Sequence, residues 1–312
     1  MRNGTIWVTA AVVLGLGLRG YHYFRNPPVW LDEGAVVANV LDKDYLSLLG
    51  ALDHHQAAPP LYLWVEKAAV DVLGDGPLAL RLPSFLVSCA AMLLIVPLAR
   101  RVLPPPAVPW AVLLFACSEE VCQHSYEIKP YAFDVFAATA LAYLYGWRDR
   151  LGLPRLLLVL AALAPPLLWV SYPACFLYGG VGVALLPAVW RDRRPRTVAA
   201  YALLAAAVGV AFLLLTLGPV RAQEQDPELV DCWTHTYPQW DRPWTVPQWA
   251  LLATLEVGRY NCKPLGQGVM LLAFVGGYLL WRDGRRDEIV LLALPLGLAL
   301  QGQRALKRLY LQ

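Results

Sequence analysis

The sequence predicts an all-α polytopic membrane protein, and its composition and the length of its apolar runs carry this prediction. Of the 312 residues, 58% are hydrophobic and 16% are charged, whereas about a quarter of the residues of a soluble domain are charged. The mean hydropathy is +0.47. The apolar residues also form runs close to the roughly 20 residues that a bilayer-spanning helix requires. This pattern excludes a water-soluble monomer.

About nine apolar runs are read as membrane-spanning helices of one transmembrane domain, residues 1–312. They lie at 4–22, 78–99, 107–123, 130–147, 153–171, 172–190, 197–218, 266–281 and 288–302. The first run follows Arg2, as in a signal peptide, but no small-residue cleavage site follows it. We therefore expect an uncleaved first helix. The third run is short for a span.

Clusters of arginine predict the orientation of the chain. They fall in alternate connections at 100–101, 148–150, 191–196 and 282–286. Because short cytoplasmic loops of membrane proteins are enriched in Lys and Arg, these loops and the N-terminus are expected in the cytoplasm. The segments 23–77 and 219–265 then form the two main extracytoplasmic loops of an inner (plasma) membrane protein. Short loops do not form the broad basic, aromatic-lined face that nucleic acid needs, so no nucleic-acid partner is expected.

The first outer loop carries two predicted amphipathic helices. One covers 30–52 and the other covers 59–74. Pro59 and Pro60 suit a helix start, because a proline in the first turn loses no helical hydrogen bond. Both stretches are too polar or too short to span the bilayer. We expect them to lie in the outer membrane interface.

Four short motifs in the first half of the chain resemble those of a known family. They are WLDEG (30–34), PPLYLWVEK (59–67), GPLALRLPSFL (76–86) and SYEIKPYAFDVF (125–136). In this order and spacing they resemble the GT-C superfamily of membrane glycosyltransferases. The resemblance is specifically to family 39, which is protein O-mannosyltransferase-like (dolichyl-phosphate-mannose-protein mannosyltransferase-like), in its bacterial branch. It covers roughly residues 1–150.

The resemblance implies a GT-C-type helix bundle and a membrane hexosyl- or pentosyltransferase. Such enzymes move a sugar from a polyprenyl-phosphate donor to a protein, lipid or glycan acceptor outside the cytoplasm. They invert the sugar carbon in a single displacement. The catalytic acid of the family's first outer loop maps onto Asp32, and Glu33 is its neighbour in the motif.

The residues themselves suggest how such chemistry could proceed. A carboxylate such as Asp32 or Glu33 can accept the proton of an acceptor hydroxyl as a general base. The alternative is structural, with Asp32 as a helix N-cap and Glu33 in the first turn. Lys129 and Arg81 are the predicted cations for the donor phosphate. For Lys129 the alternative is an interfacial lysine that extends to the lipid headgroups.

Four further residues are predicted to contact substrate, and a metal is left open. The substrate contacts are His55, Tyr62, Tyr126 and Asp134. Asp134 is expected to pair with Lys129 or to line the donor cavity. His54 and His55 could meet a divalent metal with Asp53 and Asp32, but adjacent histidines rarely point at one ion. We therefore assign no metal ligand.

The remaining expectations concern a disulfide, the end of the chain and two alternative functions. Cys232 and Cys262 share the second outer loop, where a disulfide is permitted. The chain ends shortly after its ninth predicted span, where the family usually continues, so we expect a shortened member. A transporter or flippase would need paired halves with broken helices, and no internal repeat is visible. An inactive relative that acts as a membrane scaffold is the other alternative.

Overall fold

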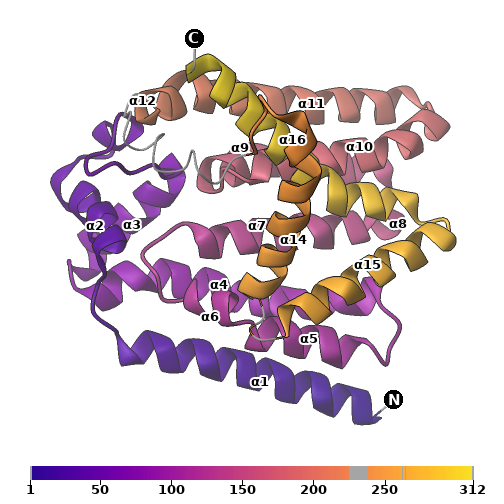
Figure 1. The fold of residues 1–312 in the computed structure, drawn as a ribbon, viewed down its shortest axis with the longest axis horizontal. Helices are drawn as coiled ribbons and strands as arrows, with labels where there is room; N and C mark the ends of the chain where they lie inside the picture. The colour runs from indigo at the N-terminus through magenta and orange to yellow at the C-terminus, as the bar shows by residue number, and fades with distance from the viewer. Residues whose placement is uncertain (1, 225–237, 262, 264, 311–312) are drawn as a thin grey trace.

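The computed structural model describes residues 2–224, 238–261, 263 and 265–310, and all the longer regular elements in these ranges are helices (Figure 1). In chain order the elements are α1 (Arg2–Arg25), α2 (Leu31–Asp42), the 3₁₀ helix η1 (Ser47–Leu49), α3 (Pro60–Leu73), α4 (Pro77–Val102), α5 (Val108–Cys117), α6 (Glu119–Gln123), α7 (Tyr131–Gly146), α8 (Arg148–Leu151), α9 (Leu153–Val170), α10 (Ala174–Asp192), α11 (Pro195–Leu215), the π-helix η2 (Thr216–Val220), α12 (Arg221–Gln223), the 3₁₀ helix η4 (Pro243–Thr245), α14 (Val246–Asn261), α15 (Gly266–Arg282) and α16 (Arg286–Tyr310). The all-α prediction is confirmed.

Within the described ranges, five helices are long and apolar enough to cross a membrane. They are α1 from Gly4, α4, α9, α10, and α11 with its continuation to Gln223. Their length and composition confirm a polytopic helical membrane protein. Three further predicted spans are helical but shorter or more polar: α7, α15 and α16.

Three predicted boundaries differ from the structure. The run 107–123 is two helices, because Ser118 is extended (φ −60°, ψ 119°) and separates α5 from α6. The helix predicted at 30–52 ends at Asp42, because Lys43 is extended. The last predicted span, 288–302, lies inside the longer helix α16.

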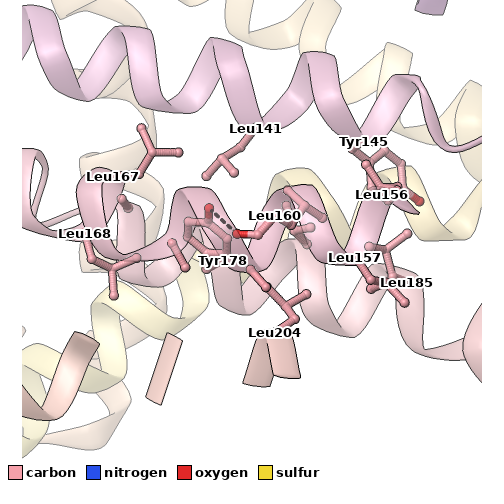
Figure 2. Close-up of a cluster of buried hydrophobic side chains, with 14 of the residues drawn as sticks. Leu141, Tyr145, Leu156, Leu157, Leu160, Leu167, Leu168, Tyr178, Leu185 and Leu204 are labelled. Carbon is pink, nitrogen blue, oxygen red and sulfur yellow. Dashed lines mark hydrogen bonds between the residues drawn. The ribbon is translucent and has the colours of Figure 1, made fainter. Parts of the chain in front are cut away.

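The largest apolar core joins α7, α9, α10 and α11. Figure 2 shows its leucines between these helices, including Leu141, Leu160 and Leu168, which are each at most 1% exposed. The Tyr178 hydroxyl donates a hydrogen bond to the Leu160 carbonyl at 3.0 Å. This bond satisfies a polar group that would otherwise cost free energy in an apolar interior.

Helix α1 lies against α4 and α5, along the edge of the bundle opposite α11 (Figure 1). Gly15 makes this approach close. A Cβ atom there would lie 2.8 Å from Met92 Sδ and 2.9 Å from the Ala116 Cβ. Any larger side chain at this position would push α1 away from its neighbours.

The segment 23–77, predicted to be the first outer loop, is docked onto the bundle. Val36 and Val40 of α2, Tyr62 of α3, and Ile128 and Phe133 from the region around the start of α7 share one buried apolar cluster. The Tyr62 and Phe133 rings meet edge to face at 5.4 Å. This cluster fixes the loop and any functional side chains that it carries.

Glu66 of α3 is buried in the same region, next to Tyr62, and no ion pair to it is found among the described residues. Burial raises the pKa of Glu66 well above its usual range, because a low-dielectric interior disfavours the charged form. Between the unfolded and folded pKa values the folded state binds more protons. The free energy of unfolding therefore falls as the pH rises across that window, by at most about 1.4 kcal/mol per pH unit.

We expect Glu66→Gln to remove this pH dependence. The variant should melt at a higher temperature than the wild type at pH 8, and the difference should shrink toward pH 5. The melting temperature in detergent, measured at several pH values, checks this. The exposed Glu119→Gln serves as the control. Parallel melting curves for wild type and Glu66→Gln would show that Glu66 is not held neutral.

Candidate active site

Asp32 and Lys129 form an ion pair at the end of the bundle where α7 begins. Asp32 is in the first turn of α2, and Lys129 lies in the connection just before α7. Lys129 Nζ lies 2.7 Å from Asp32 Oδ1, and the two side chains are 7% and 37% exposed, respectively. The acid is thus accessible to solvent, while the ammonium is mostly enclosed. The structure brings together the predicted general base and one predicted phosphate-binding cation.

Gln56 joins both members of this pair. Its Nε2 donates a hydrogen bond to Asp32 Oδ1 at 2.9 Å, and its Oε1 accepts one from Lys129 Nζ at 2.8 Å. An ammonium has three N–H donors, so one remains after the contacts to Asp32 and Gln56. Both contacts to Asp32 fall on Oδ1. Gln56 was not predicted as a site residue. In the sequence it is an amide between the histidines at 54–55 and the prolines at 59–60.

Glu33 points away from Asp32 and into a second, buried ion pair. Its Oε2 lies 3.1 Å from Arg81 NH2, and both side chains are at most 2% exposed. Its Oε1 accepts a hydrogen bond from the Ile128 backbone N–H at 2.9 Å. Arg81 NH1 also donates to Asn26 Oδ1 and to the Pro27 carbonyl, each at 2.7 Å. Glu33 and Arg81 therefore tie the chain entering α2 to α4 and to the connection before α7.

The start of α2 differs from the predicted structural alternative. The residue preceding the helix is Trp30, and Asp32 is not the N-cap. Instead, the Trp30 backbone N–H donates to Glu33 Oε2 at 3.2 Å. Glu33 thus bonds back to the first residue before the helix, and the Asp32 carboxylate forms its ion pair with Lys129.

Lys129 and the nearby Glu127 both have shifted pKa values. Burial lowers the pKa of Lys129, and the ion pair with Asp32 opposes this shift. Burial disfavours the charge on Glu127, but hydrogen bonds with His124 and Gln123 outweigh it and hold the pKa of Glu127 below its usual range. Glu127 lies 2.9 Å from His124 Nδ1.

The four predicted substrate contacts have different surroundings in the structure. Tyr126 lines a cavity next to Glu33 and Arg81. His55 is exposed, in the loop that carries Gln56. Tyr62 is fully buried in the apolar cluster. In the described part of the chain, the buried Asp134 Oδ1 has no hydrogen-bond partner. Its predicted pairing with Lys129 is wrong, because Lys129 binds Asp32 and Gln56 instead.

Two other predictions concern metal and disulfide sites. In the part of the chain that the structure describes, no group of three or more His, Cys, Asp or Glu side chains could hold a metal ion. The adjacent His54 and His55 therefore do not join Asp32 and Asp53 in such a group. Cys232 and Cys262 lie outside the described residues.

The apolar helices and the Asp32–Lys129 pair define a polytopic helical membrane protein with an acid–lysine pair at one end of its bundle. Residues 57–164 match the family model described as dolichyl-phosphate-mannose-protein mannosyltransferase. This match confirms the predicted resemblance and indicates a membrane glycosyltransferase. Neither the curated proteins nor the solved structures provide a match. Arg81 and Lys129 lie inside the matched stretch; Asp32 lies before it and joins it through the ion pair.

Proposed function

We propose that this chain is an inverting glycosyltransferase that moves a sugar from a polyprenyl-phosphate donor to an acceptor outside the cytoplasm. The observation that carries the proposal is the Asp32–Lys129 pair, which places a base and a cation 2.7 Å apart. The acceptor oxygen attacks the sugar carbon as the bond from that carbon to the phosphate oxygen breaks. The phosphate leaves with the electron pair, and Asp32 takes the acceptor's proton at Oδ2. The remaining N–H of Lys129 stabilises the leaving phosphate.

The distribution of charge along the helices supports an extracytoplasmic site. The Arg-rich connections follow the C-terminal ends of α4, α7, α10 and α15. The first loop and Lys129 lie at the N-terminal ends of α4 and α7. Since the basic ends of such helices face the cytoplasm, Asp32 and Lys129 belong on the opposite side. The same rule gives the N-terminus a cytoplasmic location, as expected for a multi-pass protein of the inner (plasma) membrane.

An apolar groove of about 580 Å³ supports a lipid-linked donor. It lies between α3, α9 and α11 and is lined by Leu61, Trp169 and Leu214 among others. Ala58 lies between Gln56 and Leu61 in the chain. Its carbonyl accepts hydrogen bonds from the Tyr172 hydroxyl and Gln223 Nε2, each at 3.0 Å, and these bonds hold the segment in place. A hydrogen-bonded stretch of chain thus runs from Leu61 of the groove to Gln56, which contacts both Asp32 and Lys129. We assign the polyprenyl chain to this groove.

Transfer of sugar from radiolabelled polyprenyl-phosphate sugars to membrane extracts tests the proposal. Membranes that contain the protein should transfer label that control membranes do not. No transfer by folded protein, across a panel of hexose and pentose donors, would contradict the proposal and favour a transporter or a scaffold.

We expect Lys129→Met to lower kcat/KM for the donor about 10- to 100-fold, because it removes one charged hydrogen bond to the phosphate. Lys67→Met is the matched control, since Lys67 pairs with Asp71 on α3. An equal loss in both variants would remove Lys129 from the donor site.

We expect kcat/KM for the donor to fall on the alkaline side before the pH reaches about 10.4, the ordinary lysine pKa. Burial lowers the pKa of Lys129, so its positive charge is lost at a lower pH. Lys129→Arg keeps the charge and should move this decline to higher pH. The pH profile of kcat/KM in the two proteins measures the shift. Coincident alkaline limbs would assign the decline to another group.

A further inference from the structure

A polar cavity of about 420 Å³ lies on the α1 side of the first outer loop. His22 and Arg25 come from the end of α1, Trp30 from the start of α2, and Arg81 from α4. Tyr126 and Glu127 close it from the connection before α7. Asp32, Gln56 and Lys129 do not line it. Glu33, which lines the cavity, directly follows Asp32 in the chain, so the cavity adjoins the Asp32–Lys129 pair.

The lining mixes flat rings with hydrogen-bonding groups. The His22 and Tyr126 rings stack with centroids 5.1 Å apart and planes inclined by 15°. Trp30 is 53% exposed and offers a further aromatic face. Among the residues that the structure describes, none accepts a hydrogen bond from the buried Arg81 Nε, although buried donors are nearly always paired. This unpaired donor indicates a ligand with an acceptor oxygen.

The charges of the lining indicate that the ligand is neutral. Arg25 and Arg81 contribute two positive charges, and Glu33 and Glu127 contribute two negative charges. The formal sum is therefore zero, which does not favour a phosphate or another anion. Alternating donors and acceptors beside aromatic faces suit a ring with many hydroxyl groups. The volume falls within the roughly 300–1,000 Å³ of small-molecule sites.

The position of the cavity favours binding of the acceptor sugar over binding of the donor sugar. In a single displacement, the nucleophile and the leaving group lie on opposite sides of the reacting carbon. The proposed donor chain lies between α3, α9 and α11, whereas the cavity lies against α1. Figure 1 shows α1 and α11 on opposite edges of the bundle, with α4 and α7 between them. The acceptor therefore enters from the side of the cavity.

We propose that this cavity binds a neutral saccharide unit of the acceptor, so that the acceptor is a glycan or glycolipid. The proposal rests on the proposed glycosyltransferase function. It places His22, Tyr126 and Trp30 against the sugar ring and the Arg81 Nε–H on one of its oxygens.

Binding of methyl glycosides without donor tests the cavity independently of catalysis. Saturation-transfer NMR with methyl α-mannoside, methyl β-glucoside and methyl β-galactoside should detect binding of at least one by the wild type. Tyr126→Leu and Trp30→Ala should each weaken that binding about five- to tenfold, as expected for the loss of one aromatic contact. If Tyr126→Leu does not fold, Trp30→Ala still tests the proposal. Trp30 is half exposed, so we expect its replacement to leave the fold intact. Tyr278→Leu, on the exposed face of α15, should bind as the wild type does.

Kinetics with the bound glycoside as acceptor and a radiolabelled polyprenyl-phosphate hexose as donor tests the assignment to the acceptor. The variants should raise KM for the glycoside and leave KM for the donor unchanged. A rise in donor KM alone would assign the cavity to the donor sugar and overturn the proposal. Absence of glycoside binding, with transfer to a Ser- and Thr-containing peptide, would overturn it and leave the proposed function intact. Cavity-dependent glycoside binding without transfer from any donor would instead overturn the proposed function.

Discussion

Asp32→Asn should lower kcat for sugar transfer about 10²- to 10⁴-fold, the contribution of a positioned general base. Asparagine has the same shape and can keep the hydrogen bond from Gln56, which now lies 2.9 Å from Asp32 Oδ1. It cannot take the proton of the acceptor hydroxyl. Since the substitution also frees Lys129 from its ion pair, KM for the donor should stay the same or fall. The separation of kcat from KM distinguishes a lost base from a damaged site.

The matched control is Asp42→Asn at the other end of the same helix, where the side chain is exposed. Its rate of transfer should equal that of the wild type. Both variants should be compared at equal amounts of folded protein, judged by melting temperature in detergent. Equal kcat values for Asp32→Asn and wild type would exclude Asp32 as the base. A rise in donor KM with unchanged kcat would instead give Asp32 a binding role.

The fold could be predicted from the sequence because a bilayer imposes a simple rule on composition. Spans such as 78–99 and 153–171 are recognised by apolar length alone, and α4 and α9 contain or closely match them. The split between α5 and α6 was missed because it depends on the backbone of one residue, Ser118. Apolar length carries no signal for a single extended residue inside a run.

The candidate site could be predicted only in part, because its geometry joins three separate segments. The motifs pointed to Asp32 and Lys129, and the structure pairs them. Pattern alone could not separate the roles of the neighbouring acids Asp32 and Glu33. Their side chains diverge because Glu33 is held by Arg81 and by the Ile128 backbone N–H. Gln56 was missed since an amide in a loop has no distinctive spacing.

Arg81→Met should destabilise the protein by about 3–5 kcal/mol, because it leaves the charge of Glu33 buried without its partner. It also removes the hydrogen bonds that Arg81 donates to Asn26 and to the Pro27 carbonyl. The melting temperature in detergent should fall sharply. Arg259→Met is the control, since Arg259 is 67% exposed and lies 4.0 Å from Glu256. An exposed pair of this kind contributes at most about 1 kcal/mol.

The double variant Glu33→Leu, Arg81→Met distinguishes a structural role of Arg81 from a role as a ligand of the donor phosphate. Replacement of both members of a buried pair by apolar residues is often nearly neutral, so the double variant should be more stable than Arg81→Met alone. Its kcat should nevertheless remain low, because α2 has lost the contacts that direct Asp32 toward Lys129. If Arg81 binds the donor phosphate directly, as its sequence context suggested, Arg81→Met would raise donor KM without a large fall in melting temperature. Three acceptors already surround its guanidinium in the structure, and we therefore expect the loss of stability.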